Sequence, residues 1–415
     1  MKVAKKFTIH SSFFIFLLPL QAGKSRADKI VVFMKSSPCA YCSRIVTSKA
    51  FLFSLWSMIA IITAILENDS NNYSIFRGVF WHTIDQTSLY AEYPEEYFDT
   101  NHYGPFFSLI VAPFAILPRW TGLLLWHIAL ALSLYFAIKT STLKNQQKVF
   151  VLLFCANELF TALTLSQFNV ATATLIFLTF TFIEKEKDIW AALCIVAGTY
   201  VKLLGIVGLA FFFFSRHKTK LVIAIIAWSI IAFFLPMIIS SPEYILGQYS
   251  EWYDSLADKN GLNQFAFYQN ISVLGMVRKI SGNPSYSDLW IIIPALMLFA
   301  IPYLRRDKYS CSSFRMMFLA STLMFVVLFS TSSESCSYII PLVGVVLWYA
   351  CVPWKRTRWD LALLIFVFVI TSLSPTDIFP AYIRKHIIQP YALKAFPVMI
   401  VWLKLTYEMC TKSYR

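Results

Sequence analysis

Charged residues are scarce in this sequence. They make up 14% of the 415 residues, whereas hydrophobic residues account for 58% and aromatic residues for 17%. Soluble domains carry about a quarter charged residues, so this composition excludes an ordinary water-soluble globular protein. The apolar stretches are spread along the whole chain and are not collected in one terminal anchor. We therefore expect an all-α polytopic membrane protein.

Acidic residues are also few, with 22 Asp and Glu against 36 Lys and Arg and a net charge of +14. Such a basic balance could indicate nucleic-acid binding, but the Lys and Arg residues form short clusters between apolar runs. That placement is typical of residues that orient membrane helices. Membrane lipids are therefore the expected partners, and nucleic acid is not.

Recognisable metal-ligand patterns are missing. The six His residues show no ligand spacing and no Asp-x-Asp pair is present, so we expect neither a metal nor a cofactor. Most of the eight Cys residues are scattered through apolar segments without a pairing pattern. Cys39 and Cys42 form one C-x-x-C, which could be redox-active or half of a zinc site. Without a second pair or a βαβ pattern, an accidental spacing in a cytoplasmic tail is favoured.

Residues 1–48 are expected to form a cytoplasmic extension ahead of a membrane-embedded domain at 49–410. A basic start followed by the apolar residues 13–20 is the layout of a signal peptide or of a short first span. Met34 could equally be the biological start. The residues themselves leave these alternatives open.

The apolar runs predict on the order of ten to twelve membrane spans. They lie at about 50–66, 105–138, 149–165, 170–184, 189–214, 221–239, 289–304, 314–331, 337–353, 359–374 and 391–409. No internal repeat or low-complexity segment is visible.

Two of these runs are too long or too broken for a simple span. The run 105–138 is interrupted by Pro118 and Arg119, which predicts a short re-entrant or surface-lying piece near 105–117. The run 189–214 joins two basic clusters and so needs an even number of crossings. We expect it to form two half-spans that meet near Lys202.

The basic clusters predict which connections face the cytoplasm. These clusters are Lys139, Lys144 and Lys148; Arg216, Lys218 and Lys220; Arg305, Arg306 and Lys308; and Lys355, Arg356 and Arg358. The outer connections are then the segments 67–104, 166–169, 240–288, 331–337 and 374–390.

The outer segment 67–104 carries seven acidic residues against the single Arg77. Asp69 lies three residues beyond Leu66, where the first span ends. Its carboxylate could act as a general base toward an acceptor hydroxyl, or it could be a solvated loop acid. Arg77 could hold a phosphate by bidentate hydrogen bonds, or it could be an ion-pair partner in an acidic loop.

Several polar residues lie in apolar surroundings, where an unpaired polar group is costly and is therefore a functional candidate. Glu158, Gln167 and Asn169 flank one outer helix end. Lys202 interrupts an apolar run and either faces protein, water or an anionic headgroup, or extends to the membrane interface. His127 is more typical of a hydrogen-bonded core residue than of a ligand.

The outer segment 240–288 combines aromatic and amide side chains. Such a combination suits a sugar, whose rings present C–H faces and hydroxyl edges, but an interfacial aromatic belt has the same composition. The residues concerned are Tyr249, Trp252, Tyr253, Tyr268, Gln264, Gln269, Asn270 and Ser272.

The order and spacing of several motifs resemble glycosyltransferase family 87, which includes polyprenyl-phosphate-dependent mannosyl- and arabinofuranosyltransferase-like membrane proteins. No motif is specific alone, but the resemblance extends over about 55–350. The motifs are residues 68–73 with Phe76-Arg77, Leu89-Tyr90, 103–107, 112–118, 166–169, the Lys202 helix, and 270–272 with Gly275 and Arg278.

The resemblance implies a GT-C-type helical bundle with its catalytic acid in the first outer loop and a sugar on a polyprenyl phosphate as donor. It implies that Asp69 is the catalytic base. The substrate-binding positions that we expect are Asn72, Arg77, Tyr103, Gln167, Asn169, Lys202, Asn270, Ser272, Arg278 and Glu334. The family's late Ser-x-x-Trp-x-His-like segment corresponds to 332–338, which has no His. Glu334 is expected to fill part of that role, and the sugar stays undetermined.

The resulting prediction is an inverting transfer of a hexosyl or pentosyl unit to a lipid or glycan acceptor. It would take place on the extracytoplasmic face of a bacterial inner membrane. The alternative is a lipid-linked sugar transporter or flippase, in which broken helices and buried polar residues are also expected. Transporters usually contain internal repeats, which this sequence lacks. A lectin-like or scaffolding protein without activity is a third possibility.

Overall fold

The computed structural model describes residues 46–283 and 285–414, and all regular structure in these residues is helical. The predicted all-α class is therefore confirmed for this part of the chain. The interpretations placed on residues 13–20, on Met34 and on the Cys39–Cys42 pair lie outside the described residues.

The helices follow one another with short connections. The first half contains α3 (Lys49–Leu66), α4 (Asn71–Asp85), α5 (Phe107–Ala115), α6 (Arg119–Thr140), α7 (Asn145–Phe154), α8 (Ala156–Leu163), α9 (Asn169–Glu184), α10 (Asp188–Lys202), the 3₁₀ helix η1 (Leu204–Phe214) and α11 (Lys218–Phe234). The second half contains η2 (Leu235–Ile238), α12 (Pro242–Asn263), α13 (Val273–Ser281), α14 (Leu289–Ala300), η3 (Ile301–Leu304), η4 (Arg306–Lys308), α15 (Ser312–Leu328), η5 (Ser335–Tyr338), α16 (Ile339–Ala350), α17 (Arg358–Val367), the π-helix η6 (Phe368–Leu373), α18 (Ala381–Ile383), η7 (Arg384–Ile388) and α19 (Ala395–Thr411).

Three helices of the described chain are long and apolar enough to cross a membrane: Lys49–Leu66, Arg119–Thr140 and Lys218–Ile238. The other apolar runs form shorter or interrupted helices. The expected run 149–165, for example, is divided at Cys155 between α7 and α8. Helical segments are thus confirmed throughout the apolar runs, whereas the predicted ten to twelve crossings stay a prediction.

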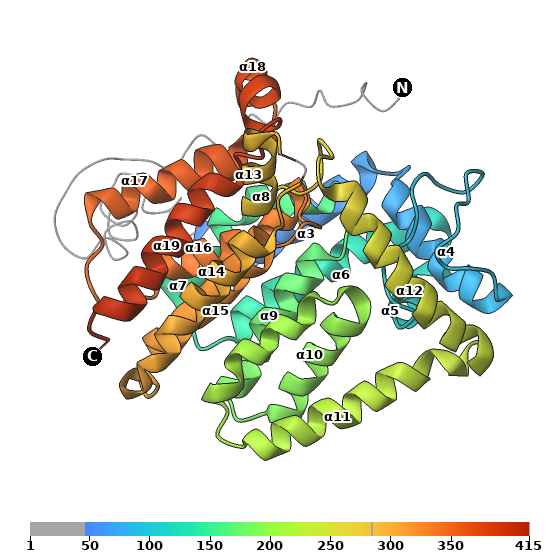
Figure 1. The fold of residues 1–415 in the computed structure, drawn as a ribbon, viewed down its shortest axis with the longest axis horizontal. Coiled ribbons are helices and arrows are strands. Elements are labelled where there is room, and N and C mark those ends of the chain that lie inside the picture. The colour runs from blue at the N-terminus through green and yellow to red at the C-terminus, as the bar shows by residue number, and fades with distance from the viewer. Residues whose placement is uncertain (1–45, 284, 415) are drawn as a thin grey trace.

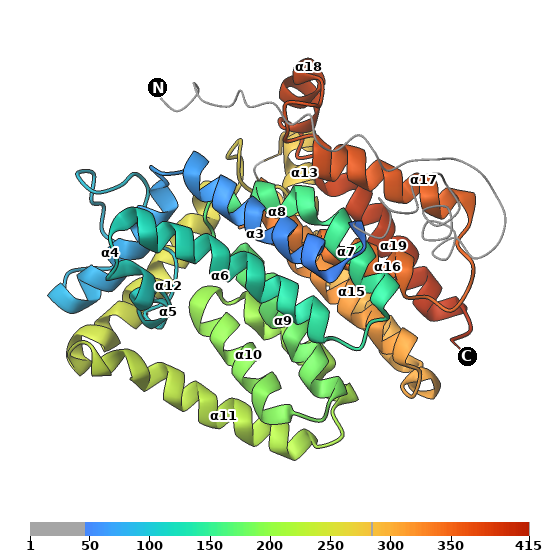
Figure 2. The ribbon, with the colours of Figure 1, turned by 180° about the vertical axis from the view of Figure 1, so that it is seen from behind.

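The centre of the bundle is formed by helices that are apolar all round. Nearly every residue of α15 and α16 is buried, as expected for helices that contact protein on every face. α19 is joined to both by tryptophans, because Trp402 Nε1 donates to Ser321 Oγ at 3.0 Å and Trp348 Nε1 donates to Glu408 Oε2 at 2.9 Å. On the other face α3 and α6 lie side by side (Figure 2).

The connections that carry the basic clusters gather at one end of the bundle, where the chain also ends (Figure 1). Arg305 Nη1 donates to the carbonyl oxygens of Met409 and Lys412, which ties the α14–α15 connection to the end of α19. Lys185 Nζ donates to Thr140 O, which joins two other connections at 2.6 Å. The positive charges therefore concentrate on one end, in agreement with a common side of the membrane.

The opposite end contains α4 and α12 (Figures 1 and 2). α12 packs across the segment 86–103, since Ser88 Oγ donates to Glu251 Oε2 at 2.5 Å and Leu89 N donates to Gln248 Oε1 at 2.7 Å. The segments that we predicted to be outer connections therefore form a second layer of structure, and this layer covers the end of the bundle.

The expectation of an acidic first loop over 67–104 needs correction, because residues 71–85 form the helix α4. The Ser70 hydroxyl accepts a hydrogen bond from Tyr73 N, which caps the helix start. Buried Tyr73, Phe76 and Phe80 recur at helical spacing, and the polar residues between them hide this pattern. Only the turn 67–70, which carries Asp69, precedes the helix.

The helix break expected near Lys202 is present, whereas the assignment of its two pieces as half-spans stays a prediction. α10 ends at Lys202, Leu203 adopts a left-handed conformation with φ 56°, and η1 returns toward the basic end. Gly198 and Gly205 allow the two pieces to touch, since a Cβ on Gly205 would lie 2.4 Å from the Gly198 carbonyl carbon. The piece expected to be re-entrant or surface-lying near 105–117 forms the short helix α5, and its position relative to the membrane stays a prediction.

We expect Gly205→Ala to destabilise the protein by about 1–3 kcal/mol, because the added methyl group meets backbone atoms that cannot move aside. Gly247→Ala in α12 is the matched control, since no atom lies within 4 Å of its added Cβ. The control should gain about 0.5–1 kcal/mol from helix propensity. Thermal unfolding in detergent measures both, and equal midpoints for the two variants would contradict the close packing of the half-spans.

Candidate functional site

Four polar side chains that were predicted separately from the sequence meet in one hydrogen-bonded group, the polar cluster of Gln167, Asn169, Lys202 and Glu334. Gln167 Nε2 donates to Glu334 Oε2 at 2.8 Å. Asn169 Nδ2 donates to Gln167 Oε1 at 3.0 Å, and Lys202 Nζ donates to Asn169 Oδ1 at 3.4 Å. An ammonium, two amides and a carboxylate are thus within reach of a single small ligand.

Each member of the polar cluster lies at a helix end. Asn169 begins α9 and Gln167 lies in the turn before it, whereas Lys202 is the last residue of α10. Glu334 precedes η5, where its backbone N–H donates to Ser337 Oγ at 3.2 Å. The helix breaks therefore bring together polar groups that continuous spans would have directed into lipid.

An aromatic wall lines one side of the polar cluster. Lys202 Nζ lies 5.5 Å from the centre of the Tyr103 ring, which in turn stacks on Phe107 at 4.6 Å. Gly104 N donates to Val201 O at 3.1 Å, and a Cβ at Gly104 would lie only 2.3 Å from Tyr200 O. Glycine at this position therefore permits the approach that brings Tyr103 to Lys202.

Burial makes the polar cluster electrostatically effective. Asn169 is 1% exposed and Gln167 is 9% exposed, whereas Lys202 and Glu334 are partly accessible. The ammonium has three N–H donors and contacts Asn169 Oδ1 at 3.4 Å and the Tyr103 side chain. Such a group can bind an anionic oxygen, and the neighbouring amides can bind hydroxyl groups.

Asp69 lies on the exposed surface of the turn between α3 and α4. Its carboxylate makes no hydrogen bond or ion pair within the described residues. The next residue, Ser70, donates to Ser166 Oγ at 2.8 Å, and Ser166 immediately precedes Gln167. The acid therefore lies at the same end of the bundle as the polar cluster.

Two other expected ligands in the first outer segment contact backbone carbonyls. Asn72 Nδ2 donates to Leu165 O at 2.7 Å. Arg77 Nη1 donates to Leu117 O at 3.0 Å and is half-buried. Both side chains hold α4 against neighbouring connections and lie outside the polar cluster.

Asn270, Ser272 and Arg278 are likewise engaged near α13. Ser272 caps this helix and donates to Asn270 Oδ1 at 2.7 Å, and Arg278 pairs with Asp288 at 2.8 Å. The segment nevertheless reaches the polar cluster through its backbone, since Ile271 N donates to Ser333 O at 2.8 Å. These side chains therefore support the shape of the site and do not converge on it.

One buried charge pair beside the polar cluster was only half predicted. Glu158 was singled out from the sequence, but its partner Lys394 was not. Lys394 Nζ donates to Glu158 Oε1 at 2.7 Å and to Ser335 O at 2.8 Å, and neither side chain is more than 3% exposed. The pair anchors the segment that carries Glu334. The sequence signal that could have indicated Lys394 was a lysine at the start of the last apolar run, 391–409.

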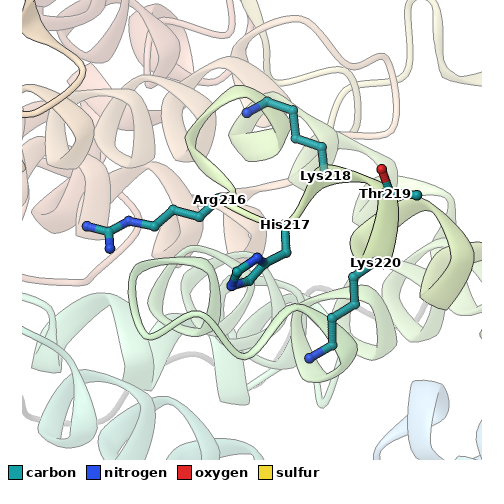
Figure 3. Close-up of a pocket in the computed structure, with 5 residues that line it drawn as sticks. All are labelled: Arg216, His217, Lys218, Thr219 and Lys220. Carbon is teal, nitrogen blue, oxygen red and sulfur yellow. The ribbon is translucent and has the colours of Figure 1, made fainter.

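One surface hollow lies away from the polar cluster. A volume of about 480 Å³ is lined by Arg216, His217, Lys218, Thr219 and Lys220, at the basic end of the bundle. In Figure 3 these side chains extend in different directions and do not converge on one point. Solvated cations in a connection explain this hollow, so we place the candidate site at the polar cluster. Among residues 46–283 and 285–414, no three His, Cys, Asp or Glu side chains are grouped to hold a metal ion.

His102 helps to hold the layer that covers the site. Its Nδ1 lies 2.8 Å from Ser255 Oγ of α12, and its backbone carbonyl accepts a hydrogen bond from Trp252 Nε1 at 3.1 Å. Burial, assisted by the charge of Lys259, lowers the pKa of His102 to about 4. Burial therefore favours the neutral imidazole at the contact between the segment 86–103 and α12.

Comparison with protein families identifies a match for part of the chain. The model of glycosyltransferase family 87 matches residues 101–331, which is more than half of the chain. No curated protein matches the sequence. The matched range includes Tyr103, Gln167, Asn169 and Lys202, whereas Asp69 lies before it.

We expect stability to fall as the pH is lowered. The folded protein holds the pKa of His102 at about 4, below its ordinary 6.5, so the unfolded chain binds more protons between these values. The stabilisation is complete above pH 6.5 and is lost as the pH falls through about 4. Thermal unfolding midpoints across this range measure it. His102→Gln should show a weaker dependence on pH, and an unchanged slope would exclude His102 as the source.

Proposed function

The chain belongs to glycosyltransferase family 87, and on this premise we propose that it transfers a hexosyl or pentosyl unit from a polyprenyl-phosphate sugar to a lipid or glycan acceptor. Family and apolar helices together make it a membrane glycosyltransferase. The donor, the inverting course and the role of Asp69 are our proposal. The observation that carries it is the polar cluster, an ammonium beside amides, next to a turn with a free carboxylate.

The donor phosphate would bind Lys202. The ammonium lies at the end of α10 against the Tyr103 ring, where surrounding protein reduces screening by water. Positive charge at this point stabilises the phosphate as it gains negative charge during departure. Electrostatic stabilisation by Lys202 makes a metal unnecessary for this step.

The sugar would lie over the remaining members of the polar cluster. Gln167 and Asn169 offer amide donors and acceptors, and Glu334 can accept from sugar hydroxyls. The Tyr103 ring suits the C–H face of a sugar. Because Asn169 is almost fully buried, its orientation is maintained before the donor arrives.

Asp69 would act as the general base. The acceptor oxygen attacks the anomeric carbon and forms the new C–O bond, while its proton moves to the Asp69 carboxylate. The bond between the anomeric carbon and the phosphate oxygen breaks, and polyprenyl phosphate leaves with both electrons. Attack from the face opposite the leaving group inverts the anomeric centre.

The reaction would take place on the extracytoplasmic side. The basic connections gather at the other end of the bundle, and such residues are retained in the cytoplasm. In a bacterial cell this corresponds to the outer face of the inner membrane. A lipid-linked sugar transporter would also use broken helices, but membership of a transferase family favours covalent transfer.

Asp69→Asn should lower sugar transfer by about 10²–10⁴-fold, because the amide cannot take the acceptor proton. Membranes are given radiolabelled polyprenyl-phosphate mannose or polyprenyl-phosphate arabinofuranose, and labelled lipid and glycan products are measured. Asp85→Asn is the matched control, as Asp85 is another exposed acid of the same outer segment. If Asp69→Asn transfers sugar at the rate of the unaltered protein, Asp69 is not the base. Movement of labelled donor across proteoliposomes without a covalent product contradicts the enzyme proposal as a whole.

Lys202→Met should raise the KM for the donor about 10–100-fold, the usual range for losing a hydrogen bond to a charged group. Lys139→Met is the control, because this lysine is exposed at the basic end of α6. Initial rates at varied donor concentration give both constants. A donor KM that Lys202→Met leaves unchanged would place the phosphate elsewhere.

A further inference from the structure

The turn between α8 and α9 is held by side chains from two other helices. From the α4 side, Ser70 Oγ donates to Ser166 Oγ at 2.8 Å and Asn72 Nδ2 donates to Leu165 O at 2.7 Å. From α6, Trp126 Nε1 donates to Ser166 O at 2.8 Å, and His127 Nε2 lies 2.9 Å from Ser166 Oγ. The four contacts converge on two consecutive residues.

The direction of each hydrogen bond follows from the donors available. Ser166 accepts from Ser70, so its own proton goes to His127 Nε2. The Thr63 hydroxyl donates to Ile59 O at 2.9 Å, so it accepts from His127 Nδ1–H at 3.0 Å. His127 is therefore a neutral imidazole with its proton on Nδ1, and the chain of hydrogen bonds extends from α3 through α6 to Ser166.

This chain of hydrogen bonds lies in surroundings where polar groups are costly. Thr63, His127 and Ser166 are fully buried, and Ser70 is 6% exposed. α3 and α6 are two of the helices long and apolar enough to cross a membrane. An apolar side chain at His127 would avoid the desolvation of an imidazole. Complete satisfaction of every member makes the network rigid.

Ser166 also adopts an unfavourable backbone conformation. Its φ is 53°, in the left-handed region that residues with a Cβ enter only at a cost of roughly 1–2 kcal/mol. The conformation turns the chain sharply between α8 and α9, so that Gln167 and Asn169 point to Glu334 and Lys202. Strain that the surrounding contacts maintain is typical of functional sites.

We propose that Ser166 and His127 form a positioning unit that fixes Asp69 relative to Gln167 and Asn169. Asp69 directly precedes Ser70, and Gln167 directly follows Ser166, so one hydrogen bond of 2.8 Å joins the acid-bearing turn to the amides. The His127 side chain contacts Ser166 Oγ, and it acts on Asp69 and on the polar cluster through this serine. The inference rests on the proposed function, which assigns the base to Asp69 and the sugar to the amides.

Loss of the positioning unit should lower kcat more than it changes the donor KM. Proton removal and attack require the base within hydrogen-bond reach of the acceptor, and a misplacement of about 1 Å can cost about 10²-fold in rate. Donor affinity depends mainly on Lys202, which α10 carries, although its ammonium also contacts Asn169 Oδ1 at 3.4 Å. Because the amides also hold the donor sugar in the proposed complex, the positioning role predicts a larger fall in kcat than rise in the donor KM.

Three variants test the positioning unit. His127→Phe retains a ring but removes both nitrogens, whereas His127→Gln keeps an acceptor for Ser166. Thr174→Val is the matched control, because Thr174 Oγ1 makes a 3.0 Å contact to Ser133 Oγ between the same two helices, α6 and α9, away from the turn. All three are compared with the unaltered full-length protein in lipid nanodiscs.

Amide hydrogen exchange reports on the two turns without any substrate. The Ser70 amide is bonded to Glu67 O and the Ser166 amide to Leu163 O, both at 2.8 Å. His127→Phe should accelerate exchange of both turns several-fold, His127→Gln should restore it, and Thr174→Val should change neither. Unaltered exchange around Ser70 in His127→Phe overturns the coupling.

Kinetics with the labelled donor that the protein accepts, polyprenyl-phosphate mannose or polyprenyl-phosphate arabinofuranose, then test the positioning role separately from the proposed function. We expect His127→Phe to lower kcat about 10–100-fold with a smaller rise in the donor KM, and His127→Gln to recover most of the kcat. If His127→Phe matches Thr174→Val while Asp69→Asn is inactive, the positioning role is wrong and the proposed function stands. If Asp69→Asn stays active while His127→Phe loosens both turns, the coupling stands and the assignment of the base fails.

Discussion

Polar groups inside this apolar bundle must find their partners within the protein, since lipid offers none. The structure meets this requirement with contacts between segments far apart in the chain. Lys394 and Glu158 are 236 residues apart, and Gln167 and Glu334 are 167 residues apart. Both contacts hold the segment around Ser335. The end of the bundle that carries the candidate site therefore depends on a few buried polar contacts between helix ends.

Interrupted helices make those contacts possible. α10 stops at Lys202, and the turn at Leu203 sends η1 back toward the basic end. The break leaves an ammonium at the level where α9 begins with Asn169. A continuous span would have directed the same lysine into lipid. The site is thus a product of where helices stop, and the outer layer of α4 and α12 then covers it.

The family match covers only part of the candidate site. Residues 101–331 include the amides and Lys202, but neither Asp69 nor Glu334. Glu334 joins the matched residues through Gln167, and Asp69 joins them through the Ser70–Ser166 contact. Hydrogen bonds between turns therefore connect the residues within the family match to the two carboxylates that we propose for sugar binding and catalysis.

Composition and local pattern determined the all-helical class, the break near Lys202 and the short helix α5, because apolar runs, prolines and isolated charges act over a few residues. They also indicated Gln167, Asn169 and Lys202 but not their contacts, whereas Glu334 was expected only from the family resemblance. The helix α4 was missed, since polar residues masked its buried aromatic face. Only tertiary structure paired Lys394 with Glu158, directed Arg278 to Asp288 and placed His127 behind Ser166. Such partners are chosen by the packing of distant helices, and that information is not present in any local stretch of sequence.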